Sequence, residues 1–162
     1  MSRLDSAIRR LKSQKLCLEF AFSKLEEIPG VIFEIGLGNG RTYDHLRELF
    51  YERKIYVFEK NVKAHPDCIP PDDFLLIGDF KKTLIGIKER IIEPIILIHF
   101  DIGSGNIVES SERASSLSFL LKDLIDKKGL IIGDQPLDKK YFFEMPTPKS
   151  IEYRRYFIYK LI

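Results

Sequence analysis

The sequence of 162 residues has few of the residues that mark several classes of protein: no tryptophan, two methionines and two cysteines. Cys17 and Cys68 can form neither the disulfide framework of a small secreted protein nor a cysteine-rich metal site. No apolar run reaches the ~18 residues that span a membrane, and the first residues lack the pattern of a secretory signal. We therefore expect a cytoplasmic protein with no membrane partner and no bound metal.

An excess of charge of either sign is also missing. The chain has 26 basic and 24 acidic residues, a net charge of +2. This balance gives no electrostatic reason to expect nucleic acid as a partner. With 44% hydrophobic and 31% charged residues the composition is that of an ordinary globular protein, and the length predicts one domain over residues 1–162.

The most informative segment is residues 31–42, Val-Ile-Phe-Glu-Ile-Gly-Leu-Gly-Asn-Gly-Arg-Thr. An apolar run that contains Glu34 leads to glycines at alternate positions, Gly36, Gly38 and Gly40, and a helical pattern follows. This order predicts a strand, a tight turn and a helix start, which together bring backbone close to a nucleotide-like cofactor. Glycine suits the turn because a Cβ would block both the positive φ angles and the close approach.

Apolar spacing along the rest of the chain predicts alternating helices and strands. Such an alternation builds a mostly parallel sheet by right-handed crossovers, with helices on both faces, so we predict an α/β fold. The last strand, in an alternating run over 153–161, is predicted to pair antiparallel in a final hairpin. The expected helices are 1–28, 41–53, 80–92 and one that begins after Asn106; the expected strands are 31–35, 55–58, 74–77, 95–100, 130–132 and the final hairpin.

An acidic residue lies in or just after each of the five predicted parallel strands: Glu34, Glu59, Asp79, Asp101 and Asp134. Ligands of such sheets bind at the carboxyl ends of the strands. Helix capping would account for Asp79 and for Asp134, but less well for Glu59, because the segment after it is rich in turns. The acidic ends therefore predict a ligand site that favours positive charge.

The G-x-G-x-G spacing with an acidic residue two positions before the first glycine resembles motif I of the class I S-adenosylmethionine (SAM) dependent methyltransferases. More narrowly, residues 34–47, with Val-Phe-Glu at 57–59, Ala-His-Pro at 64–66 and Gly-Asp at 78–79, resemble a family of small bacterial SAM-dependent methyltransferases. The resemblance runs from Glu34 to the last strand. It implies a Rossmann-like fold and transfer of a methyl group from SAM to an acceptor.

The resemblance also implies cofactor contacts at the strand ends. Glu59 would accept hydrogen bonds from both ribose hydroxyls, Asp79 would accept from the adenine amino group, and Glu34 would lie near the cofactor ammonium. Asp101 would border the methyl-transfer centre. SAM is cationic at its sulfonium and ammonium and has no phosphate, so an acidic cluster suits it. The remaining implied cofactor residues are Gly36, Leu37, Gly38, Asn39, Gly40, Thr42, Lys60, Phe80 and Ile102.

A hydroxyl or protonated amine as methyl acceptor would need a base within hydrogen-bond reach. By position Asp101 is the first candidate for this catalytic role, His99 the second and Asp134 the third. Asp101, Asp134 and Gln135 are also similar in place to the metal ligands of catechol-type methyltransferases, although we expect no metal here. The helix over 1–28, or a second subunit, would cap the site and complete the acceptor pocket.

Three functions stay open at this point. The first is methyl transfer to a small molecule, favoured by the small size and the lack of a basic face. The second is a non-catalytic module that binds SAM or S-adenosylhomocysteine (SAH). The third is an NAD(P)-binding reductase, which the glycine spacing and Glu34 disfavour because the dinucleotide fingerprint is G-x-G-x-x-G. The aromatic residues Tyr153, Tyr156, Phe157 and Tyr159 are compatible with contacts in a homodimer or a higher homo-oligomer.

Overall fold

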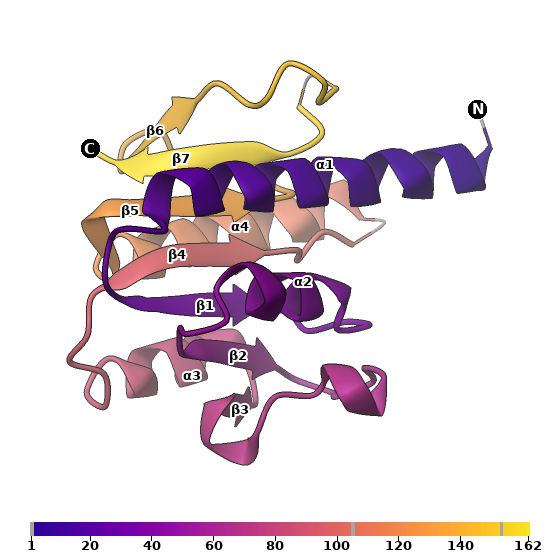
Figure 1. Cartoon of the computed structure of the whole chain (residues 1–162). Helices are drawn as coiled ribbons and strands as arrows, with labels where there is room; N and C mark the ends of the chain where they lie inside the picture. The colour runs from indigo at the N-terminus through magenta and orange to yellow at the C-terminus, as the bar shows by residue number, and fades with distance from the viewer. Residues whose placement is uncertain (1, 105, 153) are drawn as a thin grey trace.

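The computed structural model describes residues 2–104, 106–152 and 154–162, and a sheet runs through the middle of this fold (Figure 1). Its strands are β1 (Val31–Ile35), β2 (Ile55–Glu59), β3 (Leu75–Ile77), β4 (Ile95–Phe100), β5 (Ile125–Gly133), β6 (Phe142–Met145) and β7 (Phe157–Leu161). The spatial order is β3-β2-β1-β4-β5-β7-β6. The first five strands along the chain pair in parallel, whereas β7 pairs antiparallel with both β5 and β6.

The direction of strand order reverses between β1 and β4, which places the ligand crevice of this kind of sheet at their carboxyl ends. The register brings these ends level, because Ile35 pairs with Phe58 on one side and with Phe100 on the other. Gly36, Glu59 and Asp101 therefore follow directly at one edge. The predicted mostly parallel sheet with an antiparallel C-terminal strand is confirmed.

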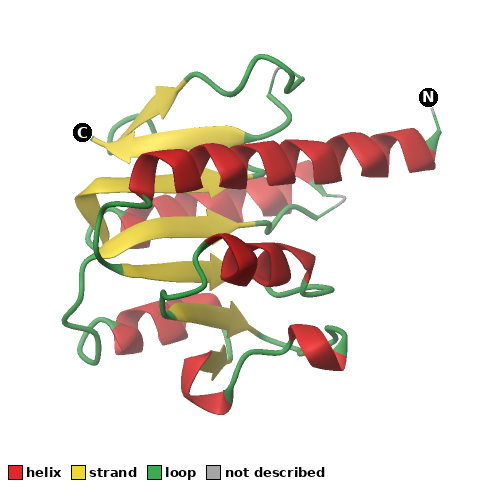
Figure 2. Cartoon of the chain, in the orientation of Figure 1, coloured by secondary structure: helices red, strands yellow, loops and turns green. Residues whose placement is uncertain are grey.

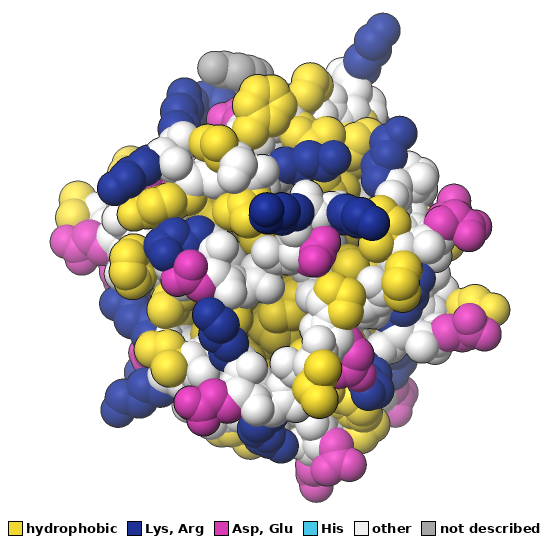
Figure 3. All heavy atoms as spheres, turned by 90° about the vertical axis from the view of Figure 1, so that its left-hand side faces the viewer, with side chains coloured by type: hydrophobic (Ala, Val, Ile, Leu, Met, Phe, Trp, Pro, Cys, Tyr) yellow, Lys and Arg dark blue, Asp and Glu magenta, His cyan; other side chains and the backbone are white. Residues whose placement is uncertain are grey.

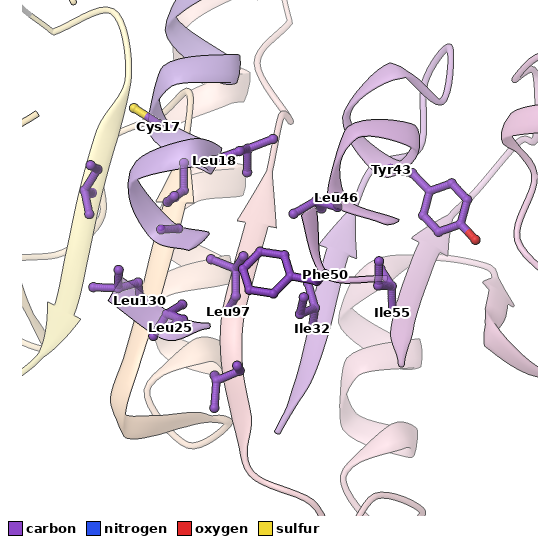
Figure 4. Close-up of a cluster of buried hydrophobic side chains, with 14 of the residues drawn as sticks. Cys17, Leu18, Leu25, Ile32, Tyr43, Leu46, Phe50, Ile55, Leu97 and Leu130 are labelled. Atoms are coloured by element: carbon purple, nitrogen blue, oxygen red, sulfur yellow. The ribbon is translucent and has the colours of Figure 1, made fainter. Parts of the chain in front are cut away.

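Helices cover both faces of the sheet (Figure 2). They are α1 (Arg3–Leu25), α2 (Arg41–Leu49), α3 (Phe80–Ile87) and α4 (Ile107–Leu121), with short 3-10 helices η1 (Pro66–Cys68) and η2 (Asp72–Phe74). The helices α1 and α2 share one buried cluster with the sheet, in which Leu25, Phe50 and Leu97 gather (Figure 4). The helices α3 and α4 bury Leu84 and Leu117 on the other face.

The first half of α1 extends beyond the core. A capping box between Ser2 and Asp5 starts the helix. Leu4 and Ile8 are 70% and 54% exposed, whereas Leu18 further along the helix is buried. Because α1 runs antiparallel to the parallel strands, its first half projects past their carboxyl ends (Figure 1). This part of the helix is therefore close to the edge at which ligands bind.

Element ends differ from the sequence prediction where local patterns gave no clear stop. The helix expected over 80–92 ends at Ile87; Ile91 beyond it still packs against the core, whereas Ile92 is 98% exposed. Ile107, the first residue of α4, is apolar but 85% exposed, so it does not belong to the buried face of the helix. The last strand begins at Phe157; the predicted start at Tyr153 lies outside the described residues.

Three of the four aromatic residues suggested for contacts between subunits belong to the interior of the chain, and the fourth, Tyr153, lies outside the described residues. Tyr156, Phe157 and Tyr159 are 1–3% exposed and pack in the two cores, so they offer no surface to a partner. On the edge that carries the amino ends of the parallel strands, basic and acidic side chains are interspersed (Figure 3). Among the described residues, no helix combines the length and the apolar character that crossing a lipid bilayer requires.

Candidate active site

A cavity of about 460 Å³ lies at the carboxyl ends of β1, β2, β3 and β4. This volume is within the range of about 300–1,000 Å³ that is typical of small-molecule and cofactor sites. Side chains from α1 and α4 border it as well as the loops that follow the strands. The cavity therefore occupies the crevice that the strand order predicts.

The glycine turn after β1 forms one wall. Gly36, Gly38 and Gly40 have φ angles of 90°, 52° and 82°, a left-handed backbone that side chains disfavour. Gly40 is also enclosed, since a Cβ there would lie 2.4 Å from the Cβ of Cys68, whereas a Cβ on Gly38 would meet nothing within 4 Å. Gly36 and Gly38 line the cavity and Gly40 does not. Gly40 thus shapes the turn on the side that faces Cys68 and not on the side that faces the cavity.

The carboxylate of Glu59 joins two loops of the cavity. Its Oε2 accepts hydrogen bonds from the backbone N–H groups of Leu37 (2.8 Å) and Gly38 (3.1 Å) in the glycine turn. Its Oε1 accepts from the N–H groups of Lys60 (2.7 Å) and Asn61 (2.9 Å). A carboxylate has about four acceptor positions, so a ligand hydroxyl at Glu59 must share or replace these bonds. Glu59 therefore holds the turn in place as well as facing the cavity.

The predicted adenine residues lie together on the next part of the wall. Asp79 is the N-cap of α3, and its Oδ1 accepts a hydrogen bond from the N–H of Lys81 at 3.0 Å. Gly78, Asp79 and Phe80 all line the cavity, as does Lys60 from the loop after β2. The structure thus combines a capping role for Asp79 with a position at the site.

Asp101, after β4, forms the opposite wall together with α1. Its Oδ2 accepts hydrogen bonds from Arg10 Nη1 (2.8 Å) and from Gln14 Nε2 (2.7 Å). Burial and the neighbouring Asp134 carboxylate raise the pKa of Asp101, and they outweigh Arg10, which lowers it. Arg10, Gln14, Asp101 and Ile102 line the same cavity. A carboxylate that takes up a proton more readily than usual therefore faces the ligand space.

The carboxylate of Asp134 binds the backbone of the loop after β4. Its two carboxylate oxygens accept hydrogen bonds from the N–H groups of Ile102 (3.0 Å) and Gly103 (2.9 Å), and Gln135 donates a third bond at 3.1 Å. Asp134 does not line the cavity, which weakens its candidacy as a base. Within the described residues, no group of three or more His, Cys, Asp or Glu side chains is arranged to hold a metal ion.

His99 and Glu34 lie beneath the site and are 0% exposed. His99 Nδ1 is 2.5 Å from Glu34 Oε2, its Nε2 is 2.7 Å from the hydroxyl of Tyr156, and Thr42 donates to Glu34 Oε1. Burial alone would lower the pKa of His99, but the Glu34 carboxylate outweighs it and raises the pKa overall. Neither His99 nor Glu34 lines the cavity. Both side chains therefore lie outside the cavity wall, and the roles predicted for His99 toward a substrate and for Glu34 near the cofactor ammonium stay predictions.

Several cavity residues were absent from the sequence prediction. Arg10, Leu11 and Gln14 come from α1, and Arg113 from α4. The sequence indicated only that the first helix would cap the site. Arg10 and Gln14 are four residues apart and so share one helix face, a pattern that could have singled them out.

Comparison with known proteins decides the family. A family model described as S-adenosyl-L-methionine methyltransferase matches residues 1–161. The chain belongs to this family. The methyltransferase is also similar to the crystal structure of an S-adenosyl-L-methionine methyl transferase from Silicibacter pomeroyi DSS-3, with 38% identity and a TM-score of 0.93; the match covers 100% of this chain and 99% of that one. The methyltransferase therefore uses SAM to methylate an acceptor, which these relations leave unidentified.

More distant structures share the fold. Human methyltransferase-like protein 13 in complex with SAH has a TM-score of 0.57 at 15% identity, covering 91% of this chain and 78% of its own. The SAH-bound methyltransferase PaMTH1 of Podospora anserina has a TM-score of 0.57 at 13% identity, covering 100% and 80%. No curated protein matches the chain. At such identities the likeness concerns the Rossmann-like methyltransferase fold alone.

Proposed function

We propose that this methyltransferase methylates a small molecule that enters its cavity beside Asp101. The observation that carries the proposal is the cavity itself: about 460 Å³, bordered on one side by the first half of α1. Such a volume suits a cofactor with a small acceptor, and the near balance of basic and acidic residues gives no electrostatic reason to expect a nucleic acid. The acceptor would approach between α1 and the loop after β4.

The chemistry of the walls supports one direction for SAM. The ribose hydroxyls and the adenine amino group are hydrogen-bond donors, which the carboxylates of Glu59 and Asp79 can accept, with Lys60 and Phe80 beside them. The amino-acid end is zwitterionic, and it would then lie past Gly36 and Gly38 toward the Arg10–Asp101 pair. In this arrangement the guanidinium meets the cofactor carboxylate and Asp101 lies near the ammonium and the methyl group.

Asp101 is the proposed base for an acceptor hydroxyl or protonated amine. SAM supplies the methyl group in activated form, so the protein contributes orientation, exclusion of water and a place for the proton. Of the candidate bases only Asp101 lines the cavity, and its raised pKa lets it take up a proton more readily than an ordinary carboxylate. Arg10 and Gln14 hold the carboxylate at this wall.

Formation of SAH from SAM over a panel of small acceptors tests the function. We expect one class of small molecule to yield SAH, and Asp101→Asn to lower kcat about 100-fold or more while the enzyme still binds SAM. Asp72→Asn, at an exposed position of η2, is the matched control and should leave the rate unchanged. Turnover with protein or RNA alone would contradict the small-molecule acceptor, and binding of SAM and SAH without turnover on any acceptor would favour a non-catalytic module.

We also propose that the enzyme works in the cytoplasm of a bacterium. Cys17 and Cys68 are both unpaired thiols, and burial raises the pKa of Cys17 to about 12. Unpaired cysteines are the usual state in the reducing cytoplasm. The relative with 38% identity comes from a bacterium. Both observations support a bacterial cytoplasmic enzyme.

A further inference from the structure

The cavity is bordered by helices from both faces of the sheet. Arg10, Leu11 and Gln14 come from α1 on one face, whereas Phe80 begins α3 and Arg113 belongs to α4 on the other face (Figure 1). Arg113 therefore borders the end of the cavity that lies on the face away from α1.

Phe80 and Arg113 occupy matching positions on the two helices. Phe80 precedes Leu84 by four residues and Arg113 precedes Leu117 by four, so each lies one turn from its leucine on the same side of its helix. Leu84 and Leu117 are buried in one core cluster, and α3 and α4 contact each other. Both helices start at the carboxyl edge of the sheet, so the turn before each leucine is the one nearer the cavity.

The guanidinium of Arg113 is held along one edge. Its Nη2 donates to Oε1 of Glu109, one turn earlier in α4, and its Nη1 donates to the carbonyl oxygen of Ile102 at 3.4 Å. Glu109 balances the positive charge, so the guanidinium repels a cationic cofactor less than an unpaired one would. The side chain of Arg113 is 43% exposed, so a ligand in the cavity can still reach it.

We propose that Arg113 is a cofactor-binding residue whose planar guanidinium packs against the face of the adenine ring. The inference rests on the cofactor direction given under Proposed function, which places the adenine at Asp79 and Phe80. Phe80 and Ile102 line the same part of the cavity and supply apolar surface for a flat ring. A guanidinium stacks on such a ring, which a lysine ammonium cannot do, because its charge is spread over a plane.

Two ligands with the same adenosine part test the proposal. SAH contains the homocysteine chain, whereas 5′-methylthioadenosine has a methyl group on the sulfur in its place. For Arg113→Met, calorimetry should show the Kd of both ligands raised by about five- to tenfold, which is within the range of one partly exposed contact between a cation and an aromatic ring. An unchanged Kd for both ligands would overturn the proposal.

Two variants separate the contact with the ring from the ion pair with Glu109. Arg113→Lys keeps the charge and the i, i+4 pairing but has no planar group, so it should bind both ligands nearly as weakly as Arg113→Met. Glu109→Gln removes the ion pair and keeps the guanidinium, so it should bind within about threefold of wild type. Wild-type affinity in Arg113→Lys, or equal losses in Glu109→Gln and Arg113→Met, would show that only the ion pair matters and would overturn the proposal.

Lys15→Met is the matched control. It breaks an ion pair of the same spacing on α1, between Lys15 Nζ and Glu19 Oε1 at 3.7 Å, and Lys15 does not line the cavity. Its Kd for both ligands should equal that of wild type. Since each variant loses one surface ion pair, urea denaturation should give Arg113→Met and Lys15→Met similar midpoints. A much lower midpoint for Arg113→Met would assign its weaker binding to the fold and would count against the proposal.

Arg10→Met separates this inference from the function on which it rests. Arg10 is at the proposed amino-acid end, so this variant should raise the Kd of SAH about tenfold and leave that of methylthioadenosine within about twofold of wild type. Equal effects on the two ligands would refute the proposed direction, as would an Arg113→Met variant that weakens SAH alone. Selective weakening of SAH in Arg10→Met, with Arg113→Met like wild type, would refute the inference and leave the proposed function standing.

Discussion

Replacement of Glu59 by glutamine should weaken both the fold and cofactor binding. In the wild type four backbone N–H groups, of Leu37, Gly38, Lys60 and Asn61, donate to its two oxygens. Glutamine has one oxygen and one NH2 group, so two of the four donors lose their acceptor whichever way the amide turns. We therefore expect the glycine turn to loosen from the end of β2 even before a ligand binds.

The magnitude follows from these bonds. A hydrogen bond to a charged group contributes about 1.5–3 kcal/mol, so two lost bonds give an upper value of about 3–6 kcal/mol. Three of the four bonds are exposed, and water replaces part of what is lost, so we expect a decrease of about 1.5–3 kcal/mol in the free energy of unfolding. For a domain of this size that corresponds to a decrease in Tm of about 3–12 °C.

Urea denaturation without ligand and calorimetry with SAM measure the two effects. Glu89→Gln, which removes an exposed carboxylate in the turn after α3, is the matched control and should change neither. Loss of affinity with unchanged stability would mean that Glu59 serves only the ligand. Unchanged stability and affinity would refute the account of this carboxylate.

Two further predictions concern the turn and the buried histidine. Gly38→Ala should lower the free energy of unfolding by about 1–2 kcal/mol, because alanine is strained in a left-handed conformation. Gly40→Ala should lower it by about 2–5 kcal/mol, because its Cβ also overlaps Cys68. Equal effects of the two variants in denaturation would contradict the enclosed position of Gly40. Because Glu34 raises the folded-state pKa of His99 above the usual 6.5, its contribution is complete below that value and is lost as the pH rises through the folded pKa. Wild type should therefore lose more stability than His99→Gln as the pH rises above the ordinary histidine pKa of 6.5, and parallel losses in urea denaturation would exclude this linkage.

Much of the fold could be predicted because its signals are local. The glycines of the turn, the acidic strand ends and the alternation of apolar segments each lie within a few residues, and together they predicted the parallel sheet and the edge at which Glu59, Asp79 and Asp101 meet. The helix ends were less well predicted, since packing decides whether a last turn forms, as at Ile92.

The parts of the site that depend on distant contacts could not be predicted. His99 is adjacent in sequence to residues at the strand end, but the alternation along β4 and the bonds to Glu34 and Tyr156 place it beneath α1. From its position in the sequence Asp134 is a further candidate acid of the site. In the structure its carboxylate instead accepts hydrogen bonds from the backbone N–H groups of Ile102 and Gly103. These pairings depend on sheet register and helix packing, which the sequence does not display.

A crystal structure of the methyltransferase with SAH would test the central claim most directly. We predict the ribose at Glu59, the adenine at Asp79 and Phe80, and the homocysteine end past the glycine turn at Arg10 and Asp101. A homocysteine end directed away from Asp101, or an adenosine bound outside this cavity, would contradict it.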